Sequence, residues 1–306
     1  MSKPARNGRA FRRVAWLAPC VAALAACVTS ETVPLPKLNP TQATTQIPQV
    51  ELLDVGVRLF DTHIPAQIKD DEEALAKKRI FPEVRGAEAG YLPGLLRATL
   101  ESSGQWGAVR VVPASAIVDV TVDGTIVSST GARLVLRITV ADSTGRTWIK
   151  DKEYSGEADL GSYKTDAALH ARDPFQNVYS GIANDMLAAR QALAANDRRD
   201  IRRVTGLRFA KEFAPQAVDG YLTTNAQGVT SVARLPADGD PVMARIARIR
   251  ERDLAVIDTV DSYYANFADK VEDSYGNFRR VSQQEIEKED RARASVVVSL
   301  RSNQTL

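Results

Sequence analysis

Two stretches of alternating apolar and polar residues constrain the fold most strongly. Valines occupy every second position over residues 118–122, and Leu, Leu, Ile and Val do so over residues 134–140. A period of two places successive side chains on opposite faces of a strand, so each stretch predicts a half-buried β-strand. Turn sequences at 129–131 and 142–145 connect these strands to each other and to a third, at 147–154. The pattern predicts a three-stranded antiparallel meander.

The residues before the meander predict a β-α-β unit. Residues 53–59 alternate like a strand, and 109–112 form a second apolar strand that ends at a proline. Between them, leucines at helical spacing over 92–100 predict a helix that stops at Gly104, and residues 70–78 predict a short exposed helix. The expected fold class is α+β, a small β-α-β-β-β sandwich domain with helices on one face, followed by a helical C-terminal region.

Three helix starts are expected in the second half. Asp173-Pro174 and Asp240-Pro241 each pair an N-capping residue with a proline at the first helical position, and Asp197 is expected to cap a third helix. An extended segment is predicted over 221–235. Apolar residues at helical spacing over 246–271 predict one long helix of about 30 residues, roughly 45 Å in length.

The last residues change character abruptly. Residues 283–293 are highly charged and helical in composition, whereas 295–300 are apolar and β-branched. We expect either a final strand there or a chain that is a truncated version of a longer one, and the sequence leaves both open.

The N-terminus reads as an export signal. Residues 1–13 are basic, and residues 14–26 form an apolar run that is too short to span a bilayer. The run ends in Leu24-Ala25-Ala26-Cys27, which resembles the lipobox of bacterial lipoproteins. The resemblance implies cleavage before Cys27 and acylation of that residue, so that membrane lipid is a partner. A plain secretory peptide is the alternative.

The same resemblance implies a location. No Asp follows Cys27, since Val28 and Thr29 come next, and in lipoproteins an Asp there retains the protein at the inner membrane. We therefore expect the periplasmic face of the outer membrane, with the inner membrane as the alternative. The expected organisation is a signal peptide (1–26), a lipidated cysteine with a flexible tether (27–48), an α/β domain (49–160) and a helical region (161–306).

Few residues could carry chemistry. Without residues 1–26 the chain has 35 basic and 38 acidic residues, which argues against nucleic acid as a partner. His63 and His170 are far apart, and no phosphate-binding loop, nucleophile elbow or zinc-protease motif is present in the sequence. The acidic run 70–73 could ligate Ca²⁺, but the lysines that follow favour a solvated helix. We expect no catalytic, cofactor-binding or metal site.

Aromatic residues on the predicted long helix give one interaction signal. Tyr263 and Tyr264 are adjacent, so both cannot face the same stripe of the helix, and Phe267 follows one turn later. Aromatic residues are enriched at the centres of interfaces, so these three are candidate partner contacts. Packing within the molecule is the alternative.

A second resemblance concerns the α/β domain. The strands over 118–126 and 134–141, the turn at 142–145 and Trp148 resemble a periplasmic domain of curli-secretion-type lipoproteins, TolB N-terminal-like domains and lipoprotein activators of penicillin-binding proteins. Residues 91–93 and 106–111 also look like an uncharacterised family of proteobacterial outer-membrane lipoproteins. The resemblance implies binding and assembly without turnover. We expect a non-enzymatic lipoprotein that docks or assembles envelope proteins. A periplasmic hydrolase acting on cell-wall material and a self-assembling (homo-oligomeric) envelope subunit are the alternatives.

Overall fold

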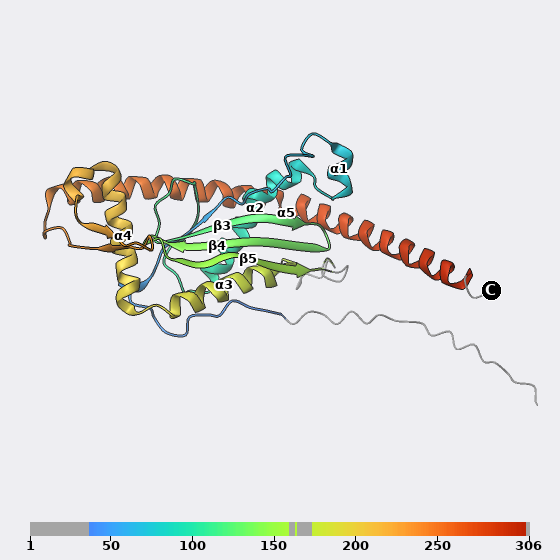
Figure 1. Ribbon diagram of the computed structural model, residues 1–306, viewed down its shortest axis with the longest axis horizontal. Helices are drawn as coiled ribbons and strands as arrows, with labels where there is room; N and C mark the ends of the chain where they lie inside the picture. The colour runs from blue at the N-terminus through green and yellow to red at the C-terminus, as the bar shows by residue number, and fades with distance from the viewer. Residues whose placement is uncertain (1–36, 159–162, 164–172, 304–306) are drawn as a thin grey trace, which may run out of the picture. The chain divides into compact units, whose positions relative to one another are not determined.

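The computed structural model describes residues 37–158, 163 and 173–303, with side chains as far as residue 296. All of these belong to one unit, Lys37–Leu306 (Figure 1). The helices are η1 (Gln49–Glu51), α1 (Glu72–Lys77), α2 (Pro82–Ser102), α3 (Gln176–Gln191), α4 (Ala195–Phe213), η3 (Pro215–Val218) and α5 (Pro241–Asn303). The strands are β1 (Val55–Arg58), β2 (Val109–Val112), β3 (Val120–Ser129), β4 (Arg133–Asp142), β5 (Thr147–Glu157), β6 (Leu222–Thr224) and β7 (Thr230–Val232).

The central sheet confirms the predicted α+β class. Its strand order is β2-β1-β3-β4-β5. β1 lies parallel to both β2 and β3, with Val55 opposite Val109 on one side and Val120 on the other. The pairs β3–β4 and β4–β5 are antiparallel and form the predicted meander.

The two faces of the sheet differ as the alternation predicts. One face is buried under α2 and α3, and α3 runs along β5 in Figure 1. Side chains from the first half of the chain, such as Val57 and Ile138, share this core with Ile182 of α3 and Tyr275 of α5. The helical region predicted from residue 161 therefore completes the core of the α/β domain. The other face carries half-buried or exposed polar residues, which include Thr121 and Asp123.

Helix α2 is longer than the leucine pattern predicts. It starts at Pro82, because a proline is well suited to the first helical position, and it contains Pro93 in its interior. Its end at Ser102 agrees with the predicted stop, since Gly104 has a φ of 64°, a conformation that favours glycine. Helix α1 confirms the short exposed helix, and Lys77 pairs with Glu73 at 2.8 Å on its solvated face.

Three details of the second half differ from prediction. Asp197 lies in the first turn of α4 and is not its cap, because the helix already begins at Ala195. The predicted extended segment is a hairpin, β6–β7, whose turn passes through Gly228 (φ 80°). Asp173 is not the cap of α3 either, because that helix begins at Gln176, although its carboxylate accepts the N–H of Phe175 (2.8 Å) in the turn before the helix. The prediction for Asp240-Pro241 is confirmed: α5 begins at Pro241, and the carboxylate of Asp240 accepts the N–H of Val242 (2.8 Å).

Helix α5 has 63 residues, about twice the predicted length, and spans about 95 Å at 1.5 Å per residue. The apolar stripe does not end at residue 271, because Tyr275 and Phe278 continue it at spacings of four and three. The charged segment 283–293 is helical as predicted. The prediction of a final strand over 295–300 is wrong, since α5 continues as far as Asn303. Helix α5 also runs beside the edge strand β2, where Asp261 accepts the N–H of Val111 at 2.7 Å.

The segment 37–48 differs from the predicted free tether. It contains no helix or strand, yet the N–H of Leu38 donates to Asn177 Oδ1 (2.9 Å). The N–H of Thr41 donates to Asn184 Oδ1 (2.8 Å), so the segment lies along α3. Among the helices that the structure describes, none is both long and apolar enough to cross a membrane.

Candidate functional site

The predicted site residues lie in different surroundings. Cys27 lies outside the described residues. Tyr264 and Phe267 face α2, because a Cβ atom added at Gly90 would lie 3.1 Å from the Tyr264 ring and 3.6 Å from that of Phe267. Tyr263 has 65 % of its surface exposed and its ring meets that of Tyr264 edge-on at 5.3 Å. Packing within the molecule, the alternative to partner contact, therefore accounts for Tyr264 and Phe267. Of the three residues, Tyr263 alone faces solvent.

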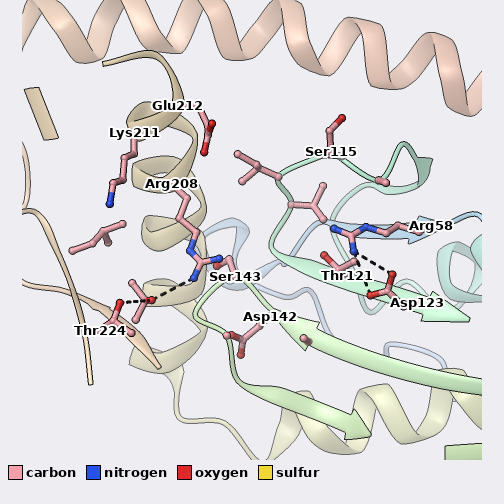
Figure 2. A pocket seen from close by; sticks show the side chains of 18 residues that line it. Arg58, Ser115, Thr121, Asp123, Asp142, Ser143, Arg208, Lys211, Glu212 and Thr224 are labelled. Atoms are coloured by element: carbon pink, nitrogen blue, oxygen red, sulfur yellow. Dashed lines mark hydrogen bonds and ion pairs between the residues drawn. The ribbon is translucent and has the colours of Figure 1, made fainter. Parts of the chain in front are cut away.

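A pocket of about 710 Å³ lies at one end of the polar face of the sheet (Figure 2). Its walls come from β1, β3 and β4, from α4, from the loop 114–118 and from the hairpin β6–β7. The hairpin is held in place by the N–H of Thr230, which donates to the carbonyl of Thr144 at 2.8 Å. Segments far apart in the sequence therefore form this pocket together.

Helix α4 presents three charged side chains to the pocket, Arg208, Lys211 and Glu212. Residues three and four apart lie on the same face of a helix, which explains why all three line one wall. Arg208 donates from Nη2 to the hydroxyl of Thr230 at 3.3 Å. Within the described part of the chain, neither Arg208 nor Lys211 forms an ion pair.

The aspartates of the pocket are already engaged. Asp123 pairs with Arg58 at 3.1 Å. Asp142 accepts the backbone N–H of Thr144 and the indole N–H of Trp148, both at 2.8 Å. These bonds fix the β4–β5 turn and the sheet surface, so the two carboxylates serve the structure of the pocket wall. The pocket is therefore a polar recess in which the free charges come from α4.

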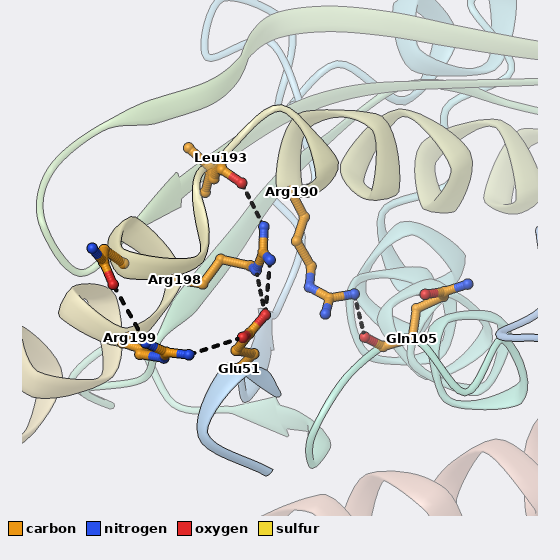
Figure 3. Close-up of polar contacts among 7 residues, drawn as sticks. Glu51, Gln105, Arg190, Leu193, Arg198 and Arg199 are labelled. Carbon is orange, nitrogen blue, oxygen red and sulfur yellow. Dashed lines mark hydrogen bonds and ion pairs between the residues drawn. The ribbon is translucent and has the colours of Figure 1, made fainter. Parts of the chain in front are cut away.

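A cluster of arginines fastens the N-terminal segment to the body (Figure 3). Glu51 accepts hydrogen bonds from Arg198 at 2.7 Å and from Arg199 at 3.4 Å. The hydrogen bond from Arg198 is the main reason why the pKa of Glu51 is lowered. Arg202 adds hydrogen bonds to the carbonyls of Gln49 and Leu52, each at 2.7 Å. The cluster thus closes η1 onto α4.

The same cluster contains a more deeply buried arginine. Arg190 is 6 % exposed and donates to the carbonyl of Gln105 at 2.9 Å. Its guanidinium lies 5.6 Å from the ring of Trp106. Burial, followed by repulsion from Arg198, lowers its pKa. These contacts join the end of α3 to the residues after α2, which is a structural role.

A buried polar network that the sequence reasoning missed fastens α5 to the rest of the fold. Tyr275 and Ser129 both donate to Glu88 Oε1, the former at 2.7 Å, and Arg85 lies 3.2 Å from Glu88 Oε2. Burial, together with the negative charge of Glu88, raises the pKa of Tyr275. The only local signal is an arginine and a glutamate on the buried face of α2, three residues apart.

One turn further along α5, Arg279 pairs with Asp173 at 2.8 Å, and both side chains are 6 % exposed. Burial alone would lower the pKa of Arg279, but attraction from Asp173 outweighs it and the pKa is raised. The guanidinium also lies 4.6 Å from the centre of the Tyr275 ring. This pair and the Glu88 network hold the middle of α5 against α2, α3 and β3.

Neither a metal site nor a known relative points to a function. The described residues contain no group of three or more His, Cys, Asp or Glu side chains that could hold a metal ion. No protein-family model, curated protein or solved structure matches the chain. Function is therefore inferred from this chain's own residues.

Proposed function

We propose that this chain is a non-enzymatic lipoprotein, anchored through acylated Cys27 to the periplasmic face of the outer membrane, that docks another envelope protein. The Leu24–Cys27 sequence supports the anchor. One structural observation carries the docking role: the described side chains of α5 from Asp290 onwards are all exposed. The partner is an envelope protein with an apolar groove that accepts a helix.

The exposed end of α5 contrasts with the part before it. Arg279 is buried against Asp173, and the ion pair of Glu289 with Arg79 (2.6 Å) joins α5 to the loop after α1. From Asp290 to Val296 every residue is exposed, and Val296 has 56 % of its surface in solvent. Most of the stability of a helix in a protein comes from the packing of one of its faces, so a partner would stabilise this exposed end. An apolar side chain on such a helix suits binding in a groove.

The path of the N-terminal segment supports an anchor on the same side of the fold as the exposed end of α5. Leu38 bonds to the first turn of α3, and Val178 in that turn packs against Gly156 near the end of β5. Gly131, in the neighbouring β3–β4 turn, touches the backbone of α5 at Arg279. Lys37, the first described residue, therefore lies near the end of the sheet beyond which α5 extends. Nine residues separate Cys27 from Lys37, and the chain between these two can span at most about 36 Å.

The test is in-cell cross-linking of the tagged full-length protein, followed by purification and mass spectrometry. A Cys27→Ala variant removes the anchor, and a variant that ends after Asp290 removes the exposed end of α5. We expect one dominant envelope protein with the unmodified chain and a large loss of it with each variant. No enriched partner, or equal capture by the shortened variant, would contradict the proposal.

A second purification, from cells that make two tagged copies, tests the alternative of self-assembly. Two differently tagged copies are expressed together, and each is recovered through its own tag. Recovery of the second copy in place of another protein would overturn docking of a partner and support a self-assembling subunit.

A further inference from the structure

We infer that the pocket beside α4 binds a small ligand through an anionic group, a carboxylate or a phosphate, and that Arg208 is its main contact. This inference does not depend on the membrane anchor or on a docking partner. It rests on the unbalanced charge of Arg208, on the hydroxyl groups around it and on the size of the recess.

The hydrogen bonding of Arg208 is incomplete. A guanidinium has five N–H donors, and arginines that are withdrawn from solvent are normally paired with carboxylates or with several acceptors. Arg208 is half-buried, yet among the described residues its hydrogen-bond partner is one threonine hydroxyl, that of Thr230, at 3.3 Å. Two other arginines of this chain, Arg198 and Arg279, meet a carboxylate at 2.7 and 2.8 Å. Arg208 therefore has donors to spare, and Figure 2 shows them directed into the recess.

The surroundings of Arg208 suit an anion. The hydroxyls of Thr230 and Thr224 lie 3.0 Å apart beside it, and Lys211, which also lines the pocket, adds a second cation without an ion pair to any described residue. The charge of Arg58 does not contribute, because Asp123 already balances it. A charge-assisted bond from a guanidinium to a carboxylate or phosphate is stronger than a neutral hydrogen bond.

The volume sets the class of ligand. About 710 Å³ lies within the range of pockets that take small organic molecules. Ile117 and Leu222 supply apolar surface beside the hydroxyl groups. The pocket therefore suits a small organic acid or a phosphate monoester with a short, mixed polar and apolar body.

One residue of the pocket opposes an anion. Glu212 is exposed and shares the wall with Arg208 one turn away on α4. Like charges in one site repel, so the carboxylate of Glu212 weakens the binding of an anion. Replacing Glu212 by glutamine should therefore raise the affinity for an anion, whereas replacing Arg208 should lower it. A merely structural role of α4 would not produce opposite changes in affinity.

The test is isothermal titration calorimetry on the purified full-length protein at low ionic strength, with inorganic phosphate and acetate as separate probes. We expect saturable binding of at least one probe in the millimolar range. Arg208→Gln is expected to weaken it at least tenfold, equivalent to about 1.4 kcal/mol. Glu212→Gln is expected to strengthen it several-fold. Arg203→Gln is the matched control, because Arg203 lies on the same helix, is exposed and pairs with Asp200 at 2.9 Å.

The outcomes are distinct. Binding of phosphate alone assigns a phosphate ligand, and binding of acetate alone assigns a carboxylate. Absence of saturable binding with both probes would overturn the inference, as would equal affinity in Arg208→Gln and the unmodified protein. Should Arg208→Gln not fold, as judged by circular dichroism, the exposed Lys211 provides a second variant. Lys211→Gln is then expected to weaken binding several-fold, and unchanged affinity would overturn the inference.

Discussion

Removing one partner of the ion pair between Arg279 and Asp173 should destabilise the fold strongly, because the charge that remains is buried. Both side chains are 6 % exposed and their charged atoms lie 2.8 Å apart. Replacement of Arg279 by methionine keeps the unbranched apolar stem of the side chain. It removes the guanidinium, so the carboxylate of Asp173 stays buried without its partner. Breaking a buried pair in this way costs about 3–5 kcal/mol of unfolding free energy. Asp173→Asn should cost a similar amount, since it leaves the guanidinium uncompensated.

The assay is urea unfolding of the unmodified protein, both single variants and the double variant, followed by circular dichroism. The double variant should be less destabilised than the sum of the singles, with a coupling energy of about 0.5–3 kcal/mol. The exposed pair Arg137–Glu153 is the control, and its loss should cost about 0–1 kcal/mol. If Arg279→Met costs no more than this control, or if the cycle shows no coupling, the reasoning is refuted.

Further predictions concern the attachment of α5 and of the N-terminal segment. Gly131→Ala should destabilise the fold by at least about 1–3 kcal/mol in the same unfolding assay, because the added Cβ atom collides with the backbone of Arg279. Gly276→Ala, with no atom of the described residues within 4 Å of its Cβ position, should instead stabilise α5 by about 0.5–1 kcal/mol, and a loss of stability would contradict this view of the helix. Since Arg198 lowers the pKa of Glu51 below its usual 4.5, the stabilisation from Glu51 is present above that pH and is lost as the pH falls through the folded-state pKa. Glu51→Gln should therefore reduce the dependence of the unfolding midpoint on pH below 4.5, and an unchanged profile would count against this pair.

The strands could be predicted because their signal is local. In β3 and β4 one face is buried and the other polar, so a period of two is visible in the sequence itself. The length of α5 was underestimated for a physical reason. Beyond Phe278 the buried residues of α5 are polar, as at Arg279 and Gln283, so the apolar period ends while the backbone remains helical.

The pocket and the buried ion pairs could not be predicted from spacing. Arg208 and Asp123 lie 85 positions apart in the sequence, and only the packing of α4 beside the sheet brings both to one recess. Likewise, the sequence predicted a local role for Asp173 at a helix start, whereas its pairing with Arg279 depends on the path of α5. Local patterns specify elements, whereas these sites arise from contacts between elements that are remote in the chain.

The proposed docking role is tested most directly by site-specific photo-cross-linking in cells. A photoreactive amino acid is placed at Val296, on the exposed end of α5, and separately at Val256, which is 61 % exposed in the first third of the same helix. The proposal predicts one strong cross-link from position 296 to an envelope protein, lost when Cys27 is replaced by alanine, and little from position 256. No protein cross-link at position 296, or an equal pattern from both positions, would contradict it.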